Sequence, residues 1–547
     1  MRATNMKKAI LKTRLLAPMV AVALLLTATA FAAAPGIKAT SFALTAQAAY
    51  VSQPDGQMIY SWGYGCAQAP GASAFVPQTT TAPFCNTMQV PGPTLIVTEG
   101  VPVSVALTNN LPVGAGNTSI LFPGFTVNAT GGVQGLLTQE AAPNTTVTYT
   151  FTPTSPGTRA YYSGTQSDLQ VEMGMYGAII VLPKTIPTAC TTGLAAANVT
   201  VEGNFGETDF RLAPAAYNSP KACYDREYLF QFSEIDPNIH TQALAQINAI
   251  AACKAASTPI CPNLDVPTEP YHPAYFMING RSMPDDMDPN YSPQYPHQPY
   301  NGNPHMHPGE QVLLRIIGQG RWQHPFHEHG NHVRILGRDG NLIQSATDAN
   351  SLAGPLLFTT TTTPGLAMDG IFYWTGRGLN WDPYGHNPNS TDPVAKLSCI
   401  PDANGYNTGV AAQSQINYYE WCADHNKPVQ GAPFGDVAGG GPVTLPDANI
   451  LTNGAWYGGS PYLGPNATQR ATGCSSDPYA NPKTTCGGTG STPPSGTIAN
   501  PPGSEAGFAF MWHSHNEREI TTNNIFPGGM MMMMLVDSRE FQIDESN

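Results

Sequence analysis

Gly and Pro occur along nearly the whole chain, with 54 Gly and 51 Pro among its 547 residues. Both residues interrupt helices and favour turns, so they divide the sequence into short segments. Between the turns lie runs rich in β-branched and aromatic residues, clearest at 95–97, 101–107, 145–151 and 178–182. Short runs of this kind bounded by turn residues are typical of strands. The pattern therefore predicts an all-β fold.

The chain is too long for one compact core, and its length indicates two to four domains. Residues 241–254 (TQALAQINAIAACK) form the one convincing amphipathic helix, and a stretch at about 376–504 is rich in Gly, Pro, Asn and Thr. Because a loop of that length is unusual within a compact domain, we expect a long insertion there. The expected organisation is a signal peptide at 1–34, a first domain at 45–185, a connecting segment with one helix at 186–270 and a second domain at 271–547.

The first 34 residues differ from the rest of the chain. Residues 2–14 carry basic side chains and no acidic ones, residues 15–33 are largely apolar, and Ala30 and Ala32 offer a small-residue cleavage site. This order of charged, apolar and small residues is typical of a secretory signal peptide, with a membrane anchor as the alternative. We therefore predict export to the periplasm or the extracellular space.

The charge balance bears on the partners of the exported chain. The formal net charge is −13, and removal of the basic signal segment makes the remainder more acidic. An acidic surface argues against nucleic acid and anionic lipid as partners. After residue 34 we find no segment long and apolar enough to span a bilayer. We expect no nucleic-acid partner and no membrane attachment after signal cleavage.

Ten cysteines in an exported chain indicate disulfide bonds. None of them forms a C-x-x-C pair or directly neighbours a histidine, so a thiolate metal site is not expected. Connectivity does not follow from sequence, but the spacing favours pairing between successive cysteines. The expected bonds are Cys66–Cys85, Cys190–Cys223, Cys253–Cys261, Cys399–Cys422 and Cys474–Cys486.

Four motifs along the chain resemble those of the multicopper oxidase family. Pro91–Leu95 resembles the opening of a first cupredoxin domain, and residues 173–181 (MGMYGAIIV) resemble its close. Residues 322–330 (WQHPFHEHG) resemble the family's third copper motif, and residues 511–515 (MWHSH) resemble the fourth. The resemblance implies two cupredoxin-like Greek-key β-barrels with a long loop-rich insertion. Two-domain relatives include the copper nitrite reductases, which act as trimers, so a homotrimer is expected from the resemblance.

The departures from the family pattern are as informative as the matches. The family's first two copper motifs have two histidines each, and the matching segments here have Leu121 with Pro123 and Tyr162 with Gly164. In the fourth motif Ser514 stands where the family has the cysteine that ligates type 1 copper. A blue copper centre needs a thiolate together with two histidines. The resemblance thus implies a first barrel without imidazole ligands and a protein without a type 1 blue copper centre.

Two His-x-His pairs remain as candidate metal ligands. Residues two apart in a strand point to the same face, so His327 projects with His329 and His513 projects with His515. If the two strands are neighbours, as in the family, four imidazoles converge. His324 matches the family's type 1 histidine and completes the set of predicted metal-binding residues.

Copper is the expected ion, with iron, manganese and zinc as alternatives. Neutral imidazole suits copper, zinc and iron, whereas carboxylates shift the preference toward iron and manganese. His332, Glu517 and Glu519 are further candidates near the two pairs. The segment His305–His307 is expected to form a solvated loop, with an accessory metal pair as the alternative. Met530–Met534 is expected to form a core strand, and the resemblance places Met530 or Met531 in the family's axial position.

These observations support two interpretations of function. In the first, the chain is an exported copper-binding protein of the multicopper oxidase type, an oxidoreductase acting on a small reductant or metal ion without a type 1 centre. In the second, it is a non-catalytic extracellular metal-binding or structural scaffold. Metal content after purification discriminates the two, because a protein without a bound transition metal favours the scaffold. Whether the chain is an enzyme stays open at this point.

Overall fold

The computed structural model describes residues 34–68, 70–76, 85, 87–192, 211–257, 260–348, 351–377, 400–409, 418–421, 459–463, 498–499, 507–537 and 543. The expected signal peptide and most of the expected insertion lie outside these residues. In the part of the chain that is described, strands dominate and helices are few. The prediction of an all-β fold is confirmed.

The first β-unit contains two five-stranded sheets. Its strands are β1 (Gly36–Lys38), β2 (Ser41–Ser52), β3 (Met58–Cys66), β4 (Phe75–Val76), β5 (Leu95–Thr98), β6 (Val103–Asn109), β7 (Asn128–Gly131), β8 (Val133–Gln134), β9 (Gln139–Glu140), β10 (Thr146–Phe151), β11 (Gly157–Tyr162) and β12 (Tyr176–Leu182). One sheet has the order β11-β12-β5-β1-β4 and the other has the order β3-β2-β6-β10-β7, while β8 and β9 form a small ribbon. Alternate residues of β6 are buried, and Val103, Val105 and Leu107 lie in a core to which both sheets contribute.

The second β-unit contains two seven-stranded sheets. Its strands are β13 (Arg226–Ile235), β14 (Tyr275–Ile278), β15 (His305–Met306), β16 (Gln311–Gly318), β17 (His324–Glu328), β18 (Val333–Arg338), β19 (Asn341–Leu342), β20 (Leu356–Leu357), β21 (Thr359–Thr362), β22 (Ala367–Tyr373), β23 (Gly459–Leu463), β24 (Ile498–Ala499), β25 (Gly507–Ser514) and β26 (Met531–Asp537). One sheet has the order β14-β13-β16-β22-β18-β19, with β20 beside β18. The other has the order β15-β26-β25-β17-β21, with β23 and β24 beyond β25. Phe232, Leu314, Phe326 and Trp512 lie in the core that the two sheets share.

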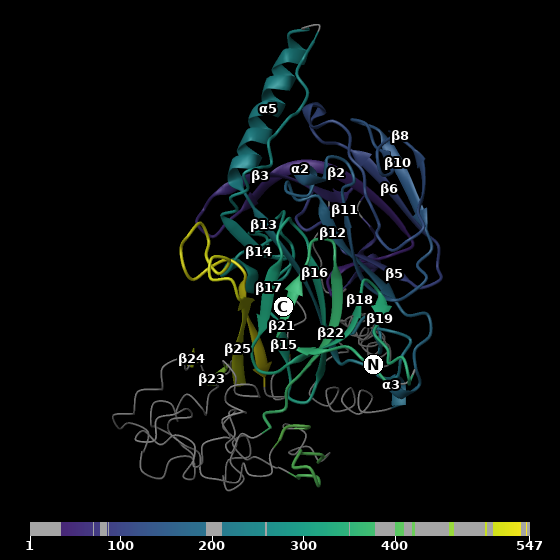
Figure 1. Cartoon of the computed structure of the whole chain (residues 1–547), viewed down its shortest axis with the longest axis vertical. Helices are drawn as coiled ribbons and strands as arrows, with labels where there is room; N and C mark the ends of the chain where they lie inside the picture. The colour runs from purple at the N-terminus through teal and green to yellow at the C-terminus, as the bar shows by residue number, and fades with distance from the viewer. Residues whose placement is uncertain are drawn as a thin grey trace, which may run out of the picture.

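Helices occupy little of the described chain, and the long one is α5 (Pro237–Ala255). The two short ones are α2 (Ser167–Gln170) and α3 (Ala189–Thr192). Helix α5 starts four residues earlier than the sequence pattern predicts, because Asp236 caps it by accepting from the backbone N–H of Asn238 and Pro237 occupies its first turn. It projects from the top of the molecule and packs its base against β3 (Figure 1).

A buried polar cluster joins the two β-units where β11 contacts β16 and β22. Thr158 donates from its backbone N–H and its hydroxyl to the carboxylate of Asp369, at 3.0 and 2.6 Å. Arg315 donates to the Thr158 hydroxyl at 3.0 Å and to Glu227 at 2.8 Å. Tyr217 donates at 2.6 Å to Asp369 Oδ2, the oxygen that also accepts from the Thr158 backbone N–H. Because all five residues are buried, each charge depends on its partners in this cluster.

The limits of the β-units differ from those expected. The first unit begins at β1 rather than at residue 45. Strand β13 lies inside the segment that we expected to be a connection, yet it pairs in parallel with β16 from Arg226 to Phe232 and is a central strand of the second unit. Tyr228, Phe230 and Phe232 form a short alternating run that carries the strand signal.

The segment His305–His307 is not the solvated loop that we expected. His305 and Met306 form β15, which pairs with β26, and both histidines are buried. His305 Nδ1 lies 2.7 Å from Asp537 Oδ2, and His307 Nδ1 lies 3.2 Å from Glu310 Oε1. These imidazoles are held by carboxylates within the fold, which explains their burial.

Three of the expected disulfide bonds are confirmed, namely Cys66–Cys85, Cys190–Cys223 and Cys253–Cys261. The pairs Cys399–Cys422 and Cys474–Cys486 lie outside the described residues. Among the described cysteines none is unpaired. The confirmed bonds are consistent with an oxidising compartment.

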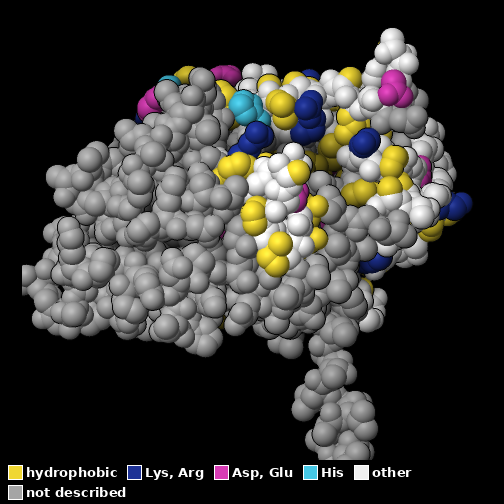
Figure 2. Space-filling view, turned by 90° about the horizontal axis from the view of Figure 1, so that it is seen from below, with side chains coloured by type: hydrophobic (Ala, Val, Ile, Leu, Met, Phe, Trp, Pro, Cys, Tyr) yellow, Lys and Arg dark blue, Asp and Glu magenta, His cyan; other side chains and the backbone are white. Residues whose placement is uncertain are grey.

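Charge is distributed unevenly over the surface. Figure 2 shows Lys and Arg side chains near the middle of the visible surface, whereas Asp and Glu lie mostly toward its rim. Hydrophobic side chains lie among them. This face therefore carries basic as well as acidic side chains, although the net charge of the chain is negative.

We expect the cluster around Asp369 to hold the two β-units together. Asp369→Ala removes the acceptor of Thr158 and Tyr217 and leaves buried Arg315 with one fewer carboxylate. Breaking a buried pair in this way costs about 3–5 kcal/mol, so the midpoint of urea unfolding should fall clearly. The matched control is Asp265→Ala at an exposed site, where a change within about 0.5 kcal/mol is expected. Equal midpoints for the two variants would contradict this role.

Candidate metal centre

The antiparallel pairing of β17 with β25 positions the candidate site. Phe326 lies opposite Ser514, and His327 lies opposite His513. Phe326 and Trp512 are completely buried in the core of the second unit. Because side chains alternate along a strand, His327 and His513 point to the other face of the sheet, away from that core. The alternation of His and aromatic residues in the sequence thus gives the sheet two different faces. The core face carries the aromatic rings, and the histidine face carries His327 and His513.

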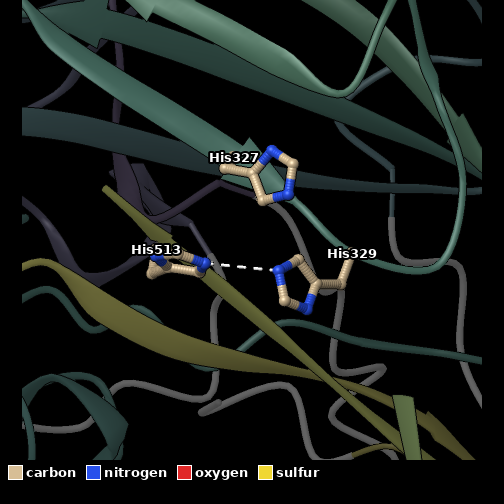
Figure 3. A group of neighbouring side chains, drawn as sticks. All are labelled: His327, His329 and His513. Carbon is tan, nitrogen blue, oxygen red and sulfur yellow. Dashed lines mark hydrogen bonds between the residues drawn. The ribbon is translucent and has the colours of Figure 1, made fainter. Parts of the chain in front are cut away.

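Three histidines meet on the histidine face. Nitrogen atoms of His327, His329 and His513 all lie within 4.8 Å of one another, and all three residues are buried. The Nε2 atoms of His329 and His513 face each other at 3.2 Å (Figure 3). Two imidazole nitrogens bound tetrahedrally at about 2.0–2.1 Å to a shared ion lie about 3.3 Å apart. The spacing of this pair therefore suits two ligands of one metal ion.

Hydrogen bonds on the far side of two rings orient them. His513 Nδ1 lies 2.7 Å from the backbone carbonyl of Ser514. Because a carbonyl oxygen only accepts, Nδ1 carries the hydrogen, and the Nε2 of the neutral ring presents a lone pair toward His329. His327 Nδ1 lies 2.8 Å from the hydroxyl of Thr359 on β21. Partners of this kind are what hold metal-ligating imidazoles in place.

The surroundings favour the neutral form of these imidazoles. Burial, followed by the charges of the neighbouring imidazoles, lowers the pKa of His327 to about 4. Burial also lowers the pKa of His513. A metal ion binds deprotonated imidazole. Near pH 7 His327 is therefore in the form that a metal ion requires.

His515 lies at the rim of the site. Its ring centre is 4.9 Å from that of His327 and 5.6 Å from that of His513, and the residue is exposed. The four imidazoles thus lie together as expected. Three of them are buried and are hereafter the histidine trio (His327, His329 and His513), and the exposed His515 lies beside them.

His324 lies on the core face of β17, away from the trio. Its Nδ1 is 2.9 Å from Glu519 and its Nε2 is 2.9 Å from Glu234, and all three residues are buried. Burial alone would lower the pKa of His324, but the hydrogen bonds and charges of the two carboxylates outweigh it and raise the pKa to about 9. Ser514 also donates to Glu519. An imidazolium between two carboxylates thus stands where the family resemblance places type 1 copper.

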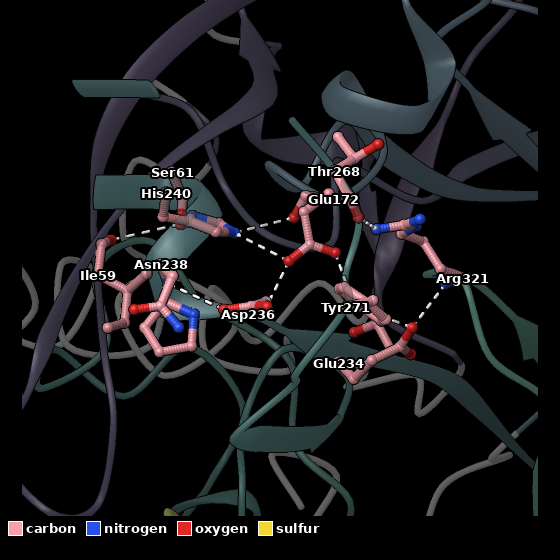
Figure 4. Close-up of polar contacts among 12 residues, drawn as sticks. Ile59, Ser61, Glu172, Glu234, Asp236, Asn238, His240, Thr268, Tyr271 and Arg321 are labelled. Atoms are coloured by element: carbon pink, nitrogen blue, oxygen red, sulfur yellow. Dashed lines mark hydrogen bonds and ion pairs between the residues drawn. The ribbon is translucent and has the colours of Figure 1, made fainter. Parts of the chain in front are cut away.

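This cluster extends into the interface between the β-units (Figure 4). The Tyr271 hydroxyl donates to Glu172 at 2.7 Å, and its oxygen lies 3.2 Å from Glu234. Glu172 in turn accepts from the backbone N–H of Asp236 at 2.7 Å and lies 3.6 Å from His240. Sequence reasoning missed Glu234, Tyr271 and Glu172. None of them stands in a recognisable motif, and they meet His324 only through the fold.

The remaining candidates are not members of the trio. Glu517 is exposed, and the ring of His332 lies tilted against Phe358 with ring centres 4.6 Å apart. Glu328 points into the core, where Thr360 donates to it at 2.6 Å, and burial raises its pKa to about 8. The carboxylates of Glu328 and Glu519 are therefore directed away from the trio.

The first β-unit supplies no imidazole, because the first histidine in the chain is His240. Leu121 forms a β-bridge with Tyr162 at the positions where the family motifs have histidines. A Cβ atom at Gly164 would meet the side chain of Leu121 at 2.7 Å, so this packing excludes a larger side chain. The absence of first-barrel ligands, which the resemblance implied, agrees with this packing.

Comparison with known proteins supports the resemblance. Residues 72–186, most of the first β-unit, match the family model described as multicopper oxidase. No curated protein matches the sequence. Within the described residues, no helix is long and apolar enough to cross a membrane.

Several solved structures are similar to the chain. The multicopper oxidase mgLAC has 14% identity and a TM-score of 0.41, over 92% of this chain and 87% of that one. A blue copper oxidase from Nitrosomonas europaea has 15% identity and a TM-score of 0.40, over 91% and 85%. A copper nitrite reductase from the same organism has 17% identity and a TM-score of 0.35, over 62% and 85%.

Two histidines three residues apart should titrate in opposite directions. In the metal-free protein, we expect His327 to stay neutral until the pH falls to about 4 and His324 to stay protonated until it rises to about 9. Proton NMR of the ring hydrogens, assigned with His327→Gln and His324→Gln, measures both. Titration of both rings near the ordinary value of about 6.5 would contradict the geometry of the two sites.

The ion pairs of His324 should also appear in the pH dependence of stability. Its folded pKa of about 9 lies above the unfolded value, so its contribution is complete below about pH 6.5 and is lost as the pH rises through 9. A shift of this size corresponds to about 3 kcal/mol. We expect urea unfolding of the wild type to show this loss and His324→Gln to lack it. Parallel pH profiles for the two proteins would count against the assignment.

Proposed function

We propose that this chain is an exported copper-binding protein, an oxidoreductase of the multicopper oxidase type that works without a type 1 centre, and that its metal site is the histidine trio. The observation that carries the proposal is the convergence of three buried imidazoles, two of them with Nε2 atoms 3.2 Å apart. Imidazole nitrogen atoms that lie within 4.8 Å of one another can offer their lone pairs to one shared partner. A metal ion bound by all three is such a partner.

Copper fits the donor set better than the alternatives. The trio offers nitrogen atoms, whereas iron and manganese sites usually include carboxylates. Glu519 is engaged with His324, and Glu517 is exposed to solvent. The family match of the first β-unit also points to copper. Zinc shares the preference for imidazole and is the control ion in the experiments below.

The chemistry differs from that of a protein with a blue centre. Bound copper would supply one-electron redox chemistry at the trio. Ser514 cannot provide the sulfur bond that carries electrons into such a centre, so the reductant must approach the trio itself. The exposed His515 lies next to His327 and marks a side from which a small reductant or a metal ion can approach. His513 is held in its ligating tautomer by the Ser514 carbonyl.

Metal stoichiometry tests the proposal. We expect about one copper ion per chain in the wild type and in His324→Gln, because His324 lies on the other face of β17. His327→Ala combined with His513→Ala should lose stoichiometric binding, since the variant removes one ligand from each strand. His272→Ala, at an exposed histidine, serves as the matched control. Equal copper content in the double variant and the control would overturn the site.

The absorption spectrum tests the chemical class of the centre. The copper-loaded wild type should lack the intense visible band of a thiolate-ligated centre, because Ser514 replaces the sulfur donor. An intense blue colour would show that another cysteine ligates copper and that the fourth motif is misaligned. A wild type that takes up neither copper nor zinc would support the non-catalytic scaffold instead.

A further inference from the structure

The strand register extends the histidine row to a methionine. His513 on β25 lies opposite His327 on β17, and on its other side it lies opposite Met531 on β26. Met511 and Met533 form the pair two residues further along the same two strands. Neighbouring residues across an antiparallel pair have Cβ atoms about 4.5–5.5 Å apart. Met531 is therefore the side chain next to His513 on the side opposite His327.

The alternation of burial shows which face each methionine takes. Met532 and Met534 lie in the core of the second unit together with Phe510 and Trp512. Met531, one residue from Met532, therefore points to the histidine face. It is only 4% exposed, so its thioether is enclosed on that face.

Met511 and Met533 point to the same face for the same reason, and each is partly exposed. A row of three methionine side chains thus borders the histidine trio. Met532 and Met534 belong to the core of the second unit, whereas these three methionines face the histidines.

We propose that Met531 supplies a thioether ligand to the ion held by the histidine trio, so that the site prefers Cu(I). The inference rests on the proposed copper site and adds its preferred oxidation state. Thioether sulfur is a soft donor that selects Cu(I), whereas three imidazoles alone also suit Cu(II) and Zn(II). The unbranched side chain of Met531 has three rotatable bonds and can adapt its sulfur to an ion beside His513. Met511 and Met533 lie on the same face and are partly exposed.

Competition with the Cu(I) chelator bathocuproine disulfonate under anaerobic conditions tests the proposal. Met531→Leu keeps an apolar side chain of similar volume and removes only the sulfur. We expect its Cu(I) affinity to fall at least tenfold and its Zn(II) affinity to change less than twofold. Met532→Leu, one residue away on the core face, is the matched control and should bind both ions as the wild type does.

X-ray absorption at the copper edge gives a second measurement. The Cu(I)-loaded wild type and Met532→Leu should show a copper–sulfur shell, and Met531→Leu should lack it. Equal Cu(I) affinities with a nitrogen-only shell in all three proteins would overturn the role of Met531 and leave the copper site standing. A wild type that binds neither Cu(I) nor Zn(II) would overturn the copper site and this inference together.

Discussion

The packing of Phe326 against Trp512 is the contact on which the rest of the second β-unit depends. The two rings lie edge to face with centres 6.0 Å apart, in the core beneath the pairing of β17 with β25. With these rings inside, His327 and His513 must point to the opposite face. A slip of one residue in either strand would place histidines in the core and aromatic rings on the histidine face, so hydrophobic burial also fixes the geometry of the histidine trio.

The same strand separates two kinds of imidazole. On the core face, two carboxylates surround His324 and keep it charged, which satisfies buried groups that would otherwise be costly. On the opposite face, burial and then the neighbouring imidazoles lower the pKa of His327 and keep it neutral. Ser514, which stands where the family has the thiolate, is part of the cluster around His324, because its hydroxyl donates to Glu519. The core face has thus become an ion-paired cluster, while the opposite face keeps the donor set of a metal site.

Much of this arrangement could be predicted from sequence where the signal is local. The β-rich runs, three disulfide bonds and the two His-x-His pairs all follow from short-range patterns. The long-range partners could not be predicted. Glu234 meets His324 across 90 residues, and Asp537 meets His305 across 232 residues. Neither contact produces a pattern in the neighbouring sequence, so the sequence predicted a solvated loop at His305. The start of α5 at Pro237 could have been predicted from sequence, because Asp236 followed by Pro237 is a typical beginning of a helix.

The central claim is that one face of β17 binds copper and the other does not. Anomalous diffraction at the copper edge from copper-loaded crystals tests it most directly. We expect a single strong anomalous peak about 2.0–2.1 Å from the Nε2 atoms of His329 and His513, and no peak beside His324. A peak among His324, Glu234 and Glu519, or none at the trio, would contradict it.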